Sequence, residues 1–103
     1  MGINWTPEAI DSFNRIASNI KRTFTEKEED NFVFEVQKTI AVIAKFPKSF
    51  PKTNLKELKG TRKALIHPHS TLFYKIVNRN KIDLLFFWDN RDNPKKLKSE
   101  KTD

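Results

Sequence analysis

The chain has 103 residues and a net charge of +7, with 37% hydrophobic and 32% charged residues. A chain of this length buries enough surface for one hydrophobic core, and this composition is typical of globular rather than disordered proteins. The chain contains no cysteine, which excludes a disulfide scaffold and a thiolate zinc site. No apolar run approaches the roughly 20 residues needed to span a bilayer.

Charge is distributed unevenly along the chain. Residues 1–44 contain five Lys or Arg against seven Asp or Glu, a net charge of −2, whereas residues 45–103 contain fifteen against six, a net charge of +9. The basic half is therefore a candidate surface for a polyanion or an acidic partner. The alternative is that scattered lysines simply keep a small protein soluble.

A short strand and a helix are predicted first. Residues 3–5 are a short apolar segment suited to a sheet edge, and Thr6 followed by Pro7 has the order of an N-cap and a first-turn proline. Apolar residues at steps of three and four predict a buried helix face, made of Ile10, Phe13, Ala17, Ile20 and Phe24. The N-terminus has no cationic region followed by an apolar one, so we expect no signal peptide and a cytoplasmic protein.

A second helix is predicted directly after the first. Thr25 and Glu28 form a capping-box pattern, in which each side chain can satisfy the other residue's backbone donor. The predicted apolar face consists of Phe32 or Val33, Val36, Ile40 and Ile43. Because the connection is short, the two helices should form an antiparallel hairpin.

The next segment, residues 45–63, is the most basic part of the chain. Its cations are Lys45, Lys48, Lys52, Lys56, Lys59, Arg62 and Lys63, against the single acid Glu57. Two prolines and the only interior glycine, Gly60, indicate an irregular loop that ends in a turn. The sequence RKALIH at 62–67 then predicts a strand, which Pro68 ends.

Residues 71–92 alternate in the manner of two strands joined by a polar turn at 78–81. One predicted face carries residues such as Leu72, Tyr74 and Leu84. The other face is also apolar, with Phe73, Val77, Leu85 and Phe87. A sheet face exposed to solvent rarely carries so many large hydrophobes, so we predict that this second face binds a partner.

Together these elements predict an α+β fold. A short N-terminal strand and an antiparallel helix hairpin should pack on a small antiparallel sheet. We expect one domain over residues 1–93, followed by a polar, basic tail over 94–103.

The order of these elements, with the pattern W-T-x-x-A at 5–9, resembles the RelE/ParE family of toxins from type II toxin–antitoxin pairs. The sheet region resembles the ParE branch in particular, through LKGTR at 58–62, HSTLFYKI at 69–76, IDLL at 82–85 and DNRDNP at 89–94. The resemblance covers almost the whole chain. It implies a cognate antitoxin as partner, a role in plasmid stabilisation, and neither a cofactor nor a metal.

The family contains two activities. RelE-like members cut messenger RNA on the ribosome, and ParE-like members act on DNA gyrase. RNA cleavage needs an acid, a base and cations near the developing phosphorane. The resemblance places Lys56 and Lys59 as loop lysines and Arg91 as the arginine after the last strand. However, Thr71 stands where the cutting members carry an arginine, and no tyrosine follows Tyr74, which leaves that catalytic set incomplete.

Three further residues have both a structural and a functional interpretation. His67 and His69 could act as acid and base or as metal ligands, or could simply end a strand; Pro68 between them directs their rings apart. Arg62 could contact a partner or substrate, or remain a surface cation. The prediction is therefore a gyrase-binding toxin with Arg62 and Arg91 among its contacts. A ribosome-dependent endoribonuclease and a non-toxic nucleic-acid-binding domain are the alternatives.

Overall fold

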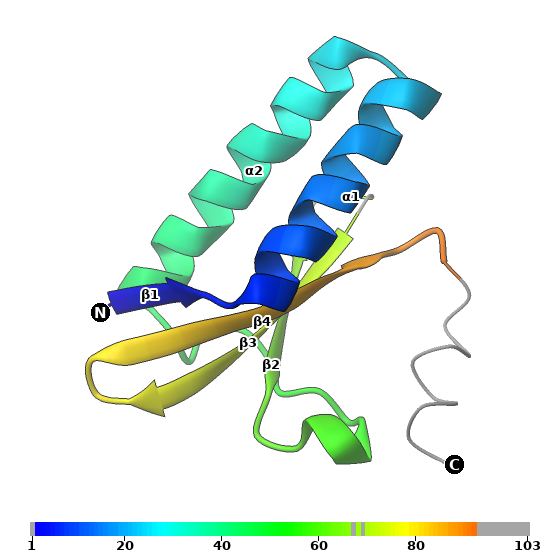
Figure 1. The fold of residues 1–103 in the computed structure, drawn as a ribbon. Coiled ribbons are helices and arrows are strands. Elements are labelled where there is room, and N and C mark those ends of the chain that lie inside the picture. Colours follow the sequence, from blue (N-terminus) through cyan, green and yellow to red (C-terminus); the bar gives the residue numbers. More distant parts are fainter. Residues whose placement is uncertain (1, 67, 69, 93–103) are drawn as a thin grey trace.

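The computed structural model describes residues 2–66, 68 and 70–92. The elements are β1 (Gly2–Trp5), α1 (Pro7–Thr23), α2 (Glu26–Lys45), the 3-10 helix η1 (Lys56–Leu58), β2 (Arg62–Ile66), β3 (Ser70–Asn78) and β4 (Lys81–Asp89). The two helices form a hairpin that lies over one face of the sheet (Figure 1). The predicted α+β fold is confirmed, whereas the predicted tail over 94–103 lies outside the described residues.

The sheet has four strands in the order β1-β4-β3-β2. Strands β2, β3 and β4 pair antiparallel, as predicted. Strand β1 forms an edge, also as predicted, but it pairs parallel to β4, with Ile3 opposite Ile82. The sheet is therefore mixed. Helix α1 follows β1 directly, and the strand that pairs with β1 is β4, the last strand in the chain.

Thr6 joins this parallel pair to helix α1. Its hydroxyl oxygen accepts a hydrogen bond from the Ala9 N–H at 3.1 Å, which makes it the N-cap that the sequence predicts. The same hydroxyl lies 2.8 Å from the Leu84 carbonyl oxygen and 3.0 Å from that of Leu85, to which it donates. One side chain thus fixes the start of α1 against β4.

The buried face of α1 is rotated from the predicted one. Ala17 and Ile20 are buried and Phe13 packs against the core, as predicted, but Ile10 is 45% exposed and Phe24 49% exposed. The buried positions instead include Ala9, Ser12 and Ile16. The prediction that Ile10 and Phe24 lie in the core was wrong. Ala9 and Ser12 occupy core positions of this helix, and a search for large hydrophobic residues does not select them.

Helix α2 follows its predicted pattern closely. The Thr25 hydroxyl oxygen accepts a hydrogen bond from the Glu28 N–H at 3.0 Å, which provides the predicted cap. Phe32, Val36 and Ile43 are buried, and Ile40 packs against the core at its margin. In the described part of the chain, no helix has both the length and the apolar composition of a membrane span.

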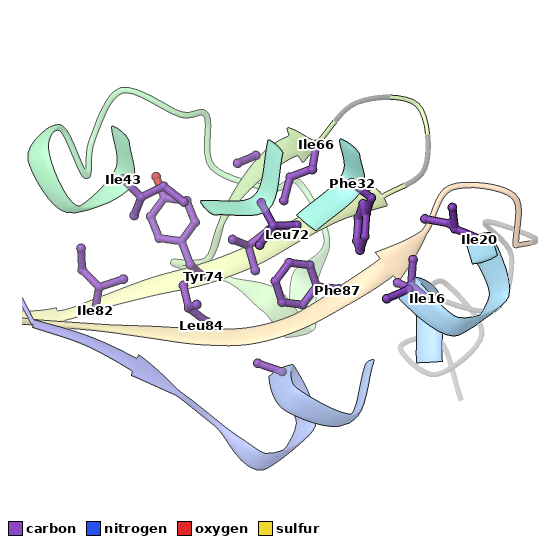
Figure 2. Close-up of a cluster of buried hydrophobic side chains, with 14 residues drawn as sticks. Ile16, Ile20, Phe32, Ile43, Ile66, Leu72, Tyr74, Ile82, Leu84 and Phe87 are labelled. Carbon is purple, nitrogen blue, oxygen red and sulfur yellow. The ribbon is translucent and has the colours of Figure 1, made fainter. Parts of the chain in front are cut away.

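A β-bulge in β4 changes which of its side chains reach the core. Phe73 pairs with Phe86, but the next residue, Tyr74, pairs with Leu84, so Leu85 is an extra residue in β4. The bulge reverses the alternation beyond it. Phe87 therefore points toward the helices beside its register partner Leu72 and is 2% exposed (Figure 2). The prediction that Phe87 lies on the outer face was wrong.

The bulged strand is joined to α1 by a buried hydrogen bond. The Phe87 N–H donates to the Ser12 Oγ at 2.8 Å, and the Ser12 hydroxyl donates to the Glu8 carbonyl oxygen at 2.7 Å. Ser12 is 2% exposed. A buried N–H without a partner is costly, so this serine satisfies a donor of β4 beyond the last residue that pairs with β1.

Ser12→Ala should lower the free energy of unfolding by about 1–3 kcal/mol, because it leaves the Phe87 N–H without its acceptor. Chemical denaturation would measure the change. Ser18→Ala is the matched control, since Ser18 is exposed on the same helix and alanine is the better helix former. Equal stability of the Ser12 variant and the wild type would show that this bond contributes nothing.

Candidate functional site

The basic segment 45–63 is held onto the sheet by two side chains from the strands. The Arg62 guanidinium donates to the carbonyl oxygens of Phe50 at 2.6 Å and Lys48 at 3.3 Å. The Tyr74 hydroxyl donates to the Pro47 carbonyl oxygen at 2.6 Å. Because these bonds come from the Arg62 Nη1 and the Tyr74 hydroxyl, the structure gives Arg62 and Tyr74 a role in fixing the path of the loop.

Burial raises the pKa of Tyr74 above its ordinary value of 10.0, and the nearby positive charge of Arg62 partly opposes this rise. Below pH 10 the hydroxyl is protonated in both the folded and the unfolded chain. Above that pH the unfolded chain loses its proton first, so the stabilising contribution of Tyr74 is lost as the pH rises through the folded pKa.

Tyr74 is the only tyrosine in the chain, so a phenolate absorbance titration reports it alone. We expect a midpoint above pH 10 in the native protein and a lower one in urea. Tyr74→Phe, which removes the absorbance change, is the blank. A native midpoint equal to the unfolded one would contradict the burial of the Tyr74 side chain.

The rest of the basic loop is built by backbone hydrogen bonds. The Thr53 N–H donates to the Thr61 carbonyl oxygen at 2.8 Å, and the Lys63 N–H donates to the Pro51 carbonyl oxygen at 3.0 Å. Gly60 has a φ of +83°, in the left-handed region, and a Cβ there would meet nothing within 4 Å. The glycine is therefore needed for the backbone turn and not for space.

Two hollows flank this loop. One, of about 500 Å³, is lined by Lys52, Thr53, Asn54, Leu55, Lys56, Lys59 and Gly60. The other, of about 380 Å³, lies on the sheet face away from the helices and is lined by Phe50, Pro51, Lys63, Leu65 and Thr71. The first is the more basic of the two, and it contains both of the predicted loop lysines, Lys56 and Lys59.

Arg91 lies just beyond the C-terminal end of β4, whose last residue is Asp89. Its Nε and Nη2 donate to the two carboxylate oxygens of Asp89, at 3.1 and 3.0 Å, and its guanidinium carbon lies 5.6 Å from the centre of the Phe24 ring. The hydrogen bond to Asp89 raises the pKa of Arg91. The Arg91 side chain is 37% exposed, so it is a positioned surface cation.

Among the candidate nuclease residues that the structure describes, Arg62 and Arg91 lie apart. Arg62 pairs with Tyr74, whereas Asp89, which holds Arg91, pairs with Ser70. The four residue steps along β3 from Ser70 to Tyr74 correspond to about 13 Å. His67 and His69 lie outside the described residues. Of the described candidates, only Lys56 and Lys59 share a hollow.

The residues of the sheet face on which we predicted a partner are only partly where the sequence placed them, and the binding itself stays a prediction. Val77 is 46% exposed and Leu85 is partly buried, but Phe73 is only 3% exposed and stacks on Phe86 at 4.7 Å. Sequence analysis missed Phe86 on this face because it did not detect the bulge.

A second exposed apolar set lies on α2, which sequence analysis also missed. Phe34 is 59% exposed, Val42 40% and Phe46 57%. Their spacing of eight and four residues places them within about 120° of the helix circumference, on a side distinct from the core face. That spacing is the feature of the sequence from which this exposed side could have been predicted.

Comparisons with known proteins agree with this architecture. No functionally curated protein matches the sequence. A chain from the chromosomal ParDE TA system of P. aeruginosa has a similar fold, with a TM-score of 0.70 over 86% of this chain and 95% of that one, at 11% sequence identity. The family model of the ParE toxin of type II toxin–antitoxin system, parDE, matches residues 3–94. The chain therefore belongs to the ParE toxin family of type II toxin–antitoxin systems.

Proposed function

We propose that this toxin acts in the cytoplasm by binding and inhibiting DNA gyrase, and that a cognate antitoxin neutralises it. Membership of the ParE toxin family supports this function. The ribosome-dependent nuclease is the alternative that the RelE branch would imply.

The observation that favours binding over cleavage is the dispersal of the candidate nuclease groups. A ribonuclease must hold its acid, base and phosphorane-stabilising cations around one phosphate. Here the Arg62 Nη1 is bound to loop carbonyls, the Tyr74 hydroxyl is bound to Pro47, and Arg91 is paired with Asp89. The described residues therefore offer no assembled catalytic set.

Two parallel assays test the proposed function. Purified toxin should block supercoiling of relaxed plasmid by gyrase, and it should leave messenger RNA on translating ribosomes intact. Toxin mixed beforehand with its antitoxin is the control and should restore supercoiling. Unaffected supercoiling together with message cut in the ribosomal decoding site would overturn the proposal in favour of the nuclease.

Arg91→Ala should change the inhibition of gyrase by less than about fivefold, because an exposed ion pair contributes roughly 0–1 kcal/mol. If the toxin instead cuts RNA with Arg91 at the phosphorane, the same variant should lose on the order of 100-fold in single-turnover cleavage. Lys27→Ala, an exposed cation on α2, is the matched control. A loss of inhibition well beyond fivefold would identify Arg91 as a direct contact with the target.

A further inference from the structure

The basic loop carries nearly all of the net charge of the protein. Residues 45–63 contain seven Lys or Arg and one acid, a net charge of +6, while the whole chain has +7. Like charges concentrated in one short segment repel one another and disfavour its folded form. An anionic partner that neutralises them would remove this repulsion.

The loop is ordered despite its charge. Hydrogen bonds from Arg62, Tyr74 and Thr53 hold its backbone against the sheet. In Figure 1 the η1 turn of this segment lies on the opposite side of the sheet from the helix hairpin, so the hairpin does not cover it. Its cations are therefore preorganised on a free surface, which lowers the entropy lost when an anion binds.

Three lysines of the loop surround one hollow. Lys52, Lys56 and Lys59 are exposed and line the hollow of about 500 Å³. Lys56 and Lys59 lie on one side of the 3-10 turn, since the Lys59 N–H donates to the Lys56 carbonyl oxygen at 3.2 Å. Among the described residues, none of the three ammonium groups has an ion-pair partner. Their charge is available to a ligand.

The residue types favour phosphate over the carboxylates of an acidic protein. Arginine is the preferred bidentate partner of a carboxylate, but the one arginine of the loop, Arg62, does not line this hollow and binds loop carbonyl oxygens through its Nη1. The cores of protein–protein interfaces are depleted of lysine and rich in aromatic anchors. The lining of this hollow contains three lysines and no aromatic residue.

We propose that this hollow binds the phosphate backbone of duplex DNA without regard to base sequence. Lys52, Lys56 and Lys59 would each neutralise a phosphate, and the small polar residues Thr53 and Asn54 beside them suit hydrogen bonds to backbone oxygens. Because no aromatic residue lines the hollow, it offers no platform for stacking an unpaired base. This binding does not depend on gyrase being the target of the toxin.

Fluorescence anisotropy with a short mixed-sequence DNA duplex, in a series of salt concentrations, tests the inference. Three phosphate contacts predict that log K falls with log salt with a slope of about −3. The triple variant Lys52→Gln, Lys56→Gln, Lys59→Gln should bind at least about tenfold more weakly at low salt and lose most of that slope. Circular dichroism would establish that the variant is folded.

The matched control removes the same charge elsewhere, through Lys21→Gln, Lys27→Gln, Lys38→Gln on the helix hairpin. This control should retain the salt slope of the wild type. Equal weakening by both triple variants would show that only net charge matters and would overturn the inference. So would an absence of DNA binding at low salt, or tighter binding of poly-L-glutamate than of DNA. Because the assay contains no gyrase, its failure is separate from failure of the proposed function.

Discussion

Phe87→Ala should lower the free energy of unfolding by about 3–5 kcal/mol, as expected for loss of a buried phenylalanine. The Phe87 ring stacks on Trp5, with 5.6 Å between ring centres, and lies at the same distance from Phe13. It thereby joins β1, α1 and β4 in one aromatic cluster. Urea denaturation monitored by the fluorescence of Trp5 and Trp88 would measure the loss.

Phe86→Ala is the matched control for this variant. Phe86 is the same residue type one position earlier, but it is only partly buried on the outer face. Its removal should therefore cost clearly less than removal of Phe87. The reverse order of the two costs would mean that β4 continues without a bulge and that the strict alternation predicted from the sequence was correct after all.

This pair of residues marks the limit of what the sequence could predict about the sheet. Alternation identified the strands because it is a local property of the chain. It could not locate the bulge, since residues 84–88 are all apolar and each register places a hydrophobe in the core. The bulge depends on distant partners: Ser12 accepts a hydrogen bond from Phe87, and Thr6 donates to Leu84 and Leu85.

The sequence predicted the residues of the candidate site but not their contacts. Composition identified the basic segment, and the structure places Lys56 and Lys59 on one hollow. The actual partners of Arg62 are carbonyl oxygens of the loop, and Arg91 lies over Phe24 from the other end of the chain. Contacts of this kind depend on the tertiary path of the backbone, which no periodicity of the sequence encodes.

We propose that the antitoxin binds the exposed apolar side of α2. Phe34, Val42 and the C-cap residue Phe46 would bury their exposed apolar surface if a partner lay along the helix. The Lys38 ammonium lies 5.8 Å from the Phe34 ring and the Lys45 ammonium 5.6 Å from the Phe46 ring. An amphipathic segment with acidic residues beside its apolar face would match both features of this strip.

Addition of the antitoxin should therefore raise the free energy of unfolding of the toxin by mass action. The expected gain is about 2.7–4.1 kcal/mol when the free antitoxin concentration is 100 to 1,000 times the dissociation constant. Thermal melting of the toxin with increasing antitoxin would measure this gain.

Phe34→Ser should leave the isolated toxin nearly as stable, since Phe34 is 59% exposed, but should weaken antitoxin binding by about 2 kcal/mol if Phe34 is an anchor. Leu65→Ser, at a 68% exposed position on β2, is the matched control. If Leu65→Ser weakened binding and Phe34→Ser did not, the antitoxin would bind the sheet and not the helix. If the melting of the toxin did not respond to the antitoxin at all, the two proteins would not be partners.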